Sequence, residues 1–114
     1  MGSTHTRLLF HVVFATHERR LRLSAPVCER LFPYLGGFIR NEGGVPVQIG
    51  GMPDHFHLLF YWRADRALSD LMRDLKRGSS RWLSESFEEL RAFHWQEGYA
   101  AFTVSESQKD RVAE

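Results

Sequence analysis

The spacing of apolar residues changes repeatedly along this chain, and the order of those changes restricts its fold more than any other feature. Residues 7–15 (RLLFHVVFA) alternate between two faces, as in a strand that is largely covered on both sides. From Ser24 the apolar residues recur at helical spacing until Gly43 and Gly44, although Pro33 predicts a kink or a later start. The same reasoning predicts strands over residues 45–49, 55–62 and 94–104, and a second helix over 67–86.

The resulting order, β-α-β-β-α-β, is that of the split ferredoxin-like arrangement. We therefore expect an α+β fold, with an antiparallel sheet and two helices packed on one of its faces. A length of 114 residues with 43% hydrophobic content suits one domain over residues 1–114 and is too short for two. After the last strand, Ser105 and Gln108 form a capping-box pattern, which predicts the start of a further helix.

Composition excludes several classes of protein. No segment approaches the roughly 18 uncharged apolar residues of a membrane span, and the N-terminus lacks an apolar signal core, so we expect a cytoplasmic protein. The single cysteine, Cys28, has no internal partner and is interpreted as a packing residue. A formal net charge of +1 argues against binding by bulk charge, so any nucleic-acid site must be local.

His55 and His57 are the sharpest local feature. Residues two apart on a strand point to the same face, so both imidazoles project together. Two neutral histidines side by side are able to ligate a divalent metal, although a pair of surface histidines near a turn is the plainer interpretation. A metal site needs a further group, and the sequence leaves Asp54, Gln48 and His11 open as candidates.

The second predicted helix carries a basic stripe. Its members recur every three to four residues, away from the apolar line, and form a plausible track for phosphates. A solvated helix face is the alternative, and Asp70 and Asp74 are placed to form local ion pairs with the stripe. The stripe consists of Arg73, Lys76, Arg77 and Arg81.

Aromatic residues are frequent, at 13% of the chain. Exposed aromatic rings stack on the bases of single strands, but in a domain of this size most aromatic side chains belong to the core. Trp95 and Tyr99, which flank Gln96, Glu97 and Gly98, are the candidates for stacking on bases.

These features together resemble the HUH-type tyrosine transposases of the insertion-sequence 200/605 group, including the REP-associated tyrosine transposases. The resemblance spans nearly the whole chain and rests on several motifs in order. The matching segments are 10–16 (FHVVFAT) with the basic Arg19 and Arg20 after it, 34–40 (YLGGFIR), 51–59 (GMPDHFHLL), 75–80 (LKRGSS) and 95–102 (WQEGYAAF).

The resemblance implies a metal-assisted reaction on single-stranded DNA. In that family two histidines, here His55 and His57, hold Mg²⁺ or Mn²⁺ at the scissile phosphate. A tyrosine hydroxyl attacks, giving a 5′-phosphotyrosine link and a free 3′-hydroxyl. The resemblance also implies a homodimer that recognises small DNA hairpins. The candidate DNA contacts in this chain are Arg19, Arg20, the basic stripe and Trp95.

The sequence departs from the family pattern at its end. The family tyrosine lies on the helix after the last strand, with a further polar metal ligand about one turn on, and this chain reaches Glu114 inside that helix. Tyr34, Tyr61 and Tyr99 do not match the family position. We therefore expect this chain to bind DNA without cutting it. A non-catalytic single-stranded nucleic-acid-binding module and a dimerising scaffold are the alternatives, and metal dependence separates them from the first reading.

Overall fold

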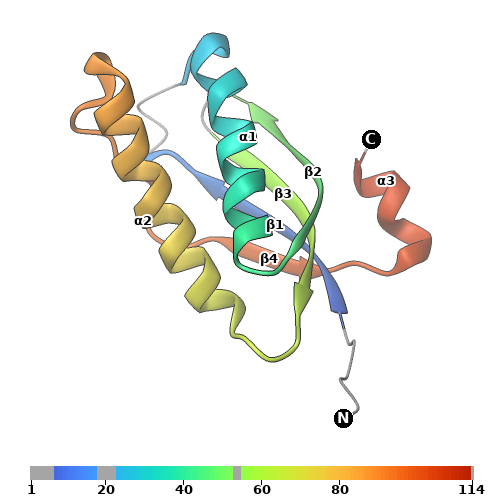
Figure 1. Ribbon diagram of the computed structural model, residues 1–114. Coiled ribbons are helices and arrows are strands. Elements are labelled where there is room, and N and C mark those ends of the chain that lie inside the picture. The colour runs from blue at the N-terminus through green and yellow to red at the C-terminus, as the bar shows by residue number, and fades with distance from the viewer. Residues whose placement is uncertain (1–6, 18–22, 53–54, 114) are drawn as a thin grey trace.

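The computed structural model describes residues 7–17, 23–52 and 55–113, and its element order confirms the expected β-α-β-β-α-β arrangement. The four strands form one antiparallel sheet in the order β2-β3-β1-β4. Helices α1 and α2 both cover one face of this sheet, whereas α3 lies apart from them (Figure 1). The elements are β1 (Arg7–Ala15), α1 (Ala25–Asn41), β2 (Val45–Met52), β3 (His55–Arg63), α2 (Leu68–Ser86), β4 (Ala100–Thr103) and α3 (Lys109–Ala113), with 3-10 turns at Glu88–Leu90 and Glu106–Gln108.

The core lies between the sheet and the two long helices. Strand β1 contributes Val12 and β3 contributes Phe56, and both are fully buried. Leu35 of α1 and Leu75 of α2 are also fully buried and belong to the same cluster. Because side chains alternate along a strand, the residues between these core positions face the other side of the sheet, which we call the open face.

Helix α1 runs without interruption from Ala25 to Asn41, so the later start predicted at Pro33 is wrong. Ser24 caps the helix by accepting a hydrogen bond from the Val27 amide at 3.5 Å, and Pro26 lies in the first turn, where its missing N–H costs nothing. Pro33 lies on the exposed side of the helix, so water can reach the carbonyl of Glu29 that the proline leaves unbonded.

Helix α2 also runs unbroken through Gly78, Ser79 and Ser80, although glycine is unfavourable in a helix interior. A Cβ atom at Gly78 would lie 3.2 Å from both Phe38 and Tyr34 of α1, so glycine allows the two helices to approach closely. The Ser79 hydroxyl accepts a hydrogen bond from Trp95 at 2.9 Å, and Ser80 donates to the Phe93 carbonyl at 3.0 Å. The small residues are therefore a packing seam between α2, α1 and the segment before β4.

Strand β4 is shorter than the predicted strand over residues 94–104. Trp95 forms an isolated bridge with Thr16, and Gly98 then takes a φ of 81°, outside the strand region. Pairing with β1 resumes at Ala100. The segment between the bridge and β4 is irregular and lies close to the middle of α2, where Lys76 contacts its backbone.

Candidate metal and DNA site

Three histidines meet on the open face because of the register between β1 and β3. His57 lies opposite Val13 and His55 lies opposite Ala15, so both imidazoles share the face of the odd-numbered residues of β1. His11 is on that face as well and lies opposite Leu59. The neighbouring His55 and His57 thus form one group with His11, which is distant in sequence, and we call this group the histidine cluster.

His57 is the centre of the histidine cluster. Its Nδ1 lies 2.9 Å from Nε2 of His11, with the two rings stacked and their centroids 5.1 Å apart. The ring of His55 lies edge-on to that of His57, with a centroid distance of 5.4 Å.

Burial favours the neutral form of His11 and His57. It lowers the pKa of His11, and it lowers the pKa of His57 with a smaller contribution from positive charge on His11 and His55. Since metal ions bind the neutral imidazole, the environment of His57 favours the form that acts as a ligand.

A cavity of about 410 Å³ opens beside the cluster on this face. Gly50 lies opposite His57, and a Cβ atom built on it would meet no atom within 4 Å, so it leaves open the space next to the imidazole. The lining residues are His11, Gln48, Gly50, Gly51, His57, Leu59 and Val112, the last from α3.

The adjacent imidazoles of His55 and His57 suit a divalent ion, and of the two only His57 lines the cavity. Among the described residues, no three His, Cys, Asp or Glu side chains converge well enough to hold a metal by themselves. An ion at His55 and His57 would therefore complete its shell with oxygen ligands. Gln48 and His11, two of the three predicted candidates for a further ligand, line the cavity, while Asp54 lies outside the described residues.

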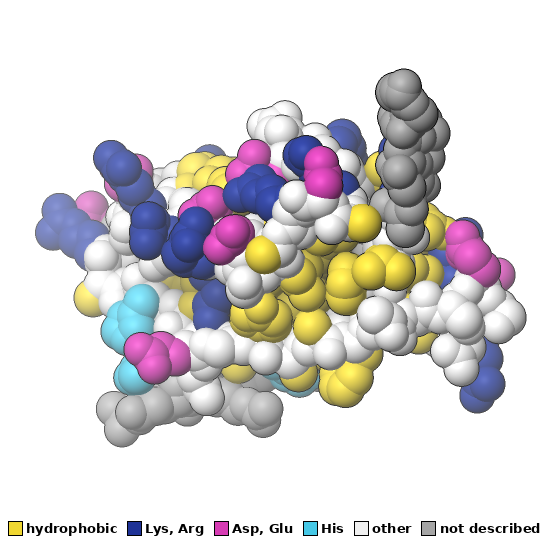
Figure 2. All heavy atoms as spheres, turned by 90° about the horizontal axis from the view of Figure 1, so that it is seen from below, with side chains coloured by type: hydrophobic (Ala, Val, Ile, Leu, Met, Phe, Trp, Pro, Cys, Tyr) yellow, Lys and Arg dark blue, Asp and Glu magenta, His cyan; other side chains and the backbone are white. Residues whose placement is uncertain are grey.

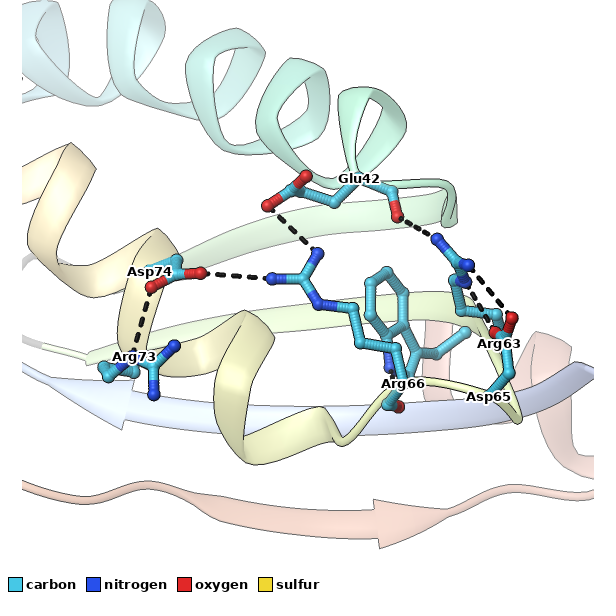
Figure 3. Close-up of polar contacts among 7 residues, drawn as sticks. Glu42, Arg63, Asp65, Arg66, Arg73 and Asp74 are labelled. Atoms are coloured by element: carbon cyan, nitrogen blue, oxygen red, sulfur yellow. Dashed lines mark hydrogen bonds and ion pairs between the residues drawn. The ribbon is translucent and has the colours of Figure 1, made fainter.

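The predicted basic stripe is on α2, which packs on the face of the sheet opposite the histidine cluster (Figure 1). Arg73 pairs with Asp70 at 3.3 Å. It also pairs with Asp74 at 3.2 Å, the contact drawn in Figure 3. Lys76 donates to the carbonyls of Gln96 at 2.5 Å and Gly98 at 2.7 Å. Its ammonium group is therefore hydrogen-bonded to the backbone of the segment before β4.

Arg81 and Arg77 complete the stripe. Arg81 lies 3.6 Å from Glu85, while Arg77 is exposed and has no ion pair with any residue that the structure describes. Figure 2 shows basic and acidic side chains interspersed on the surface that it draws, rather than one continuous basic patch. Arg77 is therefore the member of the stripe with the most freedom to meet a phosphate.

The predicted role of Trp95 in base stacking needs correction. Its side chain is only 6% exposed and packs against Phe14, Phe56 and Phe93, so it has no free ring face for a base. The other predicted DNA contacts, Arg19 and Arg20, lie outside the described residues.

Phe102 is an exposed aromatic residue that sequence reasoning did not single out. It is 57% exposed and lies opposite His11 on β4, with ring centroids 6.4 Å apart. Its position next to the histidine cluster depends on the pairing of β4 with β1, which the sequence pattern does not specify.

None of the chain's three tyrosines lines the cavity. Tyr34 of α1 stacks on Trp82 at 4.8 Å, in the helical layer. Tyr61 is on β3, and its hydroxyl donates to Glu106, an interaction that raises the pKa of the phenol. Tyr99 precedes β4 and is 37% exposed.

Within the described part of the chain, no helix has the length and apolar character needed to cross a membrane.

Comparison with known proteins places this geometry in a family. The chain is 25% identical over 111 residues to the ISDra2 transposase TnpA of Deinococcus radiodurans, an alignment that covers 93% of this chain and 79% of the relative. A solved structure of a candidate transposase from Deinococcus radiodurans R1 superposes with a TM-score of 0.84 at 26% identity, covering 98% of this chain and 90% of that one.

A second solved structure, a REP-associated tyrosine transposase bound to a REP hairpin, superposes with a TM-score of 0.68 at 14% identity. That superposition covers 98% of this chain and 67% of the other, and it shows a shared fold. The family profile described as "Transposase IS200 like" matches residues 4–114. The chain therefore belongs to the IS200-like transposase family.

Proposed function

We propose that this chain binds single-stranded, hairpin-forming DNA on the open face of its sheet, with Mg²⁺ or Mn²⁺ held by His55 and His57. The observation that carries the proposal is the histidine cluster itself, in which the imidazoles of His55 and His57 share one face of the sheet and His57 lines an open cavity. Membership of the IS200-like transposase family supports DNA as the partner, as does the REP hairpin bound to a protein of the same fold.

The chain's own residues would position the phosphate. His55 and His57 would hold the ion, and the space beside Gly50 would admit the DNA backbone. When bound, the ion would supply Lewis-acid polarisation of a phosphoryl oxygen. Between the two ions, Mn²⁺ is the softer and suits imidazole ligands better than Mg²⁺ does.

The tyrosines of this chain support binding without cutting. None of Tyr34, Tyr61 and Tyr99 lines the cavity beside the histidine cluster, and hydrogen bonding to Glu106 raises the pKa of Tyr61, the tyrosine of β3. Tyr34 is packed in the helical layer. We therefore propose that the 5′-phosphotyrosine chemistry of the transposase reaction requires a tyrosine other than these three.

The proposal extends to assembly and location. Strand β4 is at an edge of the sheet and its four residues are all exposed, so its free backbone groups are available to a second copy of the chain. We therefore propose that the chain forms a homodimer and that this dimer acts on DNA in the cytoplasm.

A non-catalytic binding module is the second candidate function. The exposed ring of Phe102 favours it, because base stacking needs no metal. The two functions differ in their response to metal removal.

Fluorescence anisotropy with a labelled DNA hairpin carrying a single-stranded flank, measured in Mn²⁺ and in EDTA, tests the proposal. We expect Mn²⁺ to tighten binding by wild type, and the double variant His55→Ala/His57→Ala to bind equally in both buffers. If the wild type bound DNA equally well with and without Mn²⁺, the metal-dependent site would be rejected in favour of the non-catalytic binding module. Denaturing gels of the same mixtures should show no covalent DNA adduct, and a reproducible adduct would overturn binding without cutting.

Arg77 offers a separate test of the basic stripe. If it contacts a phosphate, Arg77→Ala should weaken binding and reduce the slope of log K against log salt by about 1. Arg73→Ala is the matched control, since its guanidinium is already paired with Asp70 and Asp74, and its effect should be smaller. If the salt dependence of binding were the same for wild type and Arg77→Ala, α2 would not be part of the DNA interface.

A further inference from the structure

The contact between His11 and His57 joins two ring nitrogens of specified identity. Nε2 of His11 faces Nδ1 of His57 at 2.9 Å, a normal hydrogen-bond length. A hydrogen bond between two neutral imidazoles needs an N–H donor on one ring and an unprotonated nitrogen on the other. The tautomer of one ring therefore determines the tautomer of the other.

The shape of the sheet fixes this pair. His11 is on β1 and His57 is on the adjacent β3, in a register that continues along all nine residues of β1. The rings are stacked with an interplanar angle of 15°, so the contact restrains the orientation of His57 as well as its protons.

The two possible donors have opposite consequences for His57. If His11 donates, Nδ1 of His57 is bare and Nε2 carries the proton, which prevents Nε2 from acting as a ligand. If His57 donates from Nδ1, its Nε2 keeps a free lone pair. Ligating histidines commonly donate their second N–H to a neighbouring acceptor, and that acceptor fixes the tautomer and the ring orientation.

We propose that His11 is a positioning residue that accepts a hydrogen bond from Nδ1–H of His57 and thereby presents Nε2 of His57 to the metal ion. The inference rests on the proposed metal site at His55 and His57. It assigns His11 a role beside the metal shell, in place of the ligand role left open by the sequence. Its bare Nε2 is occupied by the hydrogen bond, and its Nδ1 carries the proton.

Imidazole ¹⁵N NMR of the metal-free chain tests the hydrogen bond directly. In wild type we expect a protonated Nδ1 and a bare Nε2 on His57. In His11→Phe the acceptor is lost, so His57 should shift toward the tautomer protonated at Nε2. In His11→Gln the amide oxygen can replace the acceptor, and the wild-type tautomer should persist. An unchanged His57 tautomer in His11→Phe would overturn the inference.

Mn²⁺ affinity, measured from the EPR signal of free Mn²⁺, separates positioning from ligation. We expect His11→Phe to weaken binding about 10- to 100-fold, the usual cost of losing such a partner, while His11→Gln stays within about threefold of wild type. An equal loss in both variants, with the His57 tautomer unchanged in the glutamine variant, would make His11 a third ligand and contradict positioning.

His17→Phe is the matched control, because it removes another histidine just beyond β1 whose ring packs against His94. It should leave both readouts at wild-type values. Failure of wild type to bind Mn²⁺ at all would reject the proposed metal site, whereas Mn²⁺ binding with no effect of His11→Phe would reject this inference alone.

Discussion

Trp95 and Phe102 are aromatic residues seven positions apart, and the fold gives them opposite environments. Trp95 lies in the core, with its indole N–H satisfied by Ser79, whereas Phe102 projects from the edge strand beside His11. The sequence does not distinguish the two, because both are aromatic residues of the segment 95–102. Their difference comes from the bridge at Thr16, which turns Trp95 inward before β4 begins.

Substitution of the two residues should therefore have different effects. Trp95→Ala removes a buried indole and is expected to lower the free energy of unfolding by about 3–5 kcal/mol. Phe102→Ala, at an exposed site, should change it by less than about 0.5 kcal/mol. Urea unfolding followed by circular dichroism measures both, and a small loss for Trp95→Ala would contradict its placement in the core.

The histidine cluster predicts a pH dependence of stability in the absence of metal. Because the folded-state pKa values of His11 and His57 are lowered from 6.5, the unfolded chain binds more protons than the folded chain below that pH. Their contribution to stability is therefore present above pH 6.5 and is lost as the pH falls through the folded pKa values.

Urea unfolding in EDTA between pH 7.5 and 5 measures this dependence. We expect wild type to lose stability across the range and His11→Gln/His57→Gln to lose less, so the two curves approach one another at low pH. Parallel curves would show that these imidazoles titrate alike in the folded and unfolded chains.

At the scale of the elements, Arg66 ties three of them together. It follows β3 and lies 3.0 Å from Glu42 at the end of α1 and 3.1 Å from Asp74 of α2, as Figure 3 shows. Its guanidinium also lies 5.7 Å from the ring of Trp62, and its carbonyl accepts from the Trp62 indole at 2.9 Å. The link is half-buried, where ion pairs are screened less than at the surface.

Loss of this link should cost more than loss of a local surface pair. Arg66→Ala is expected to destabilise the fold by about 1–2 kcal/mol, since it removes the half-buried cation that Glu42 and Asp74 share. The control is Arg63→Ala, whose ion-pair partner Asp65 is two residues away and exposed, and its effect on stability should be clearly smaller. Equal thermal unfolding curves for the two variants would show that Arg66 contributes no more to stability than Arg63 does.

At the scale of the whole molecule, the order of the elements is readable from the sequence because each long element carries its own period. The switch from two-residue to helical spacing marks α1 and α2 to within about two residues. The extent of β4 could not be predicted from the sequence. The segment before it contains aromatic residues typical of a strand, but Trp95 is buried in the core outside any regular strand.

The candidate site was predictable in part. His55 and His57 share a face by local alternation, so their pairing follows from the sequence alone. The contact of His11 with His57 depends on the register between β1 and β3, and the cavity depends on α3, which places Val112 over the sheet. These are long-range features, and no local pattern encodes them.

Paramagnetic broadening by Mn²⁺ tests the location of the metal most directly. In ¹H–¹⁵N spectra of the chain with bound hairpin DNA, substoichiometric Mn²⁺ should broaden signals of the open face first, above all those of His57, His55 and Gly50. Signals from the outer surface of α1, on the other side of the sheet, should remain sharp. Broadening centred elsewhere, or none at all, would contradict a metal-assisted DNA site at the histidine cluster.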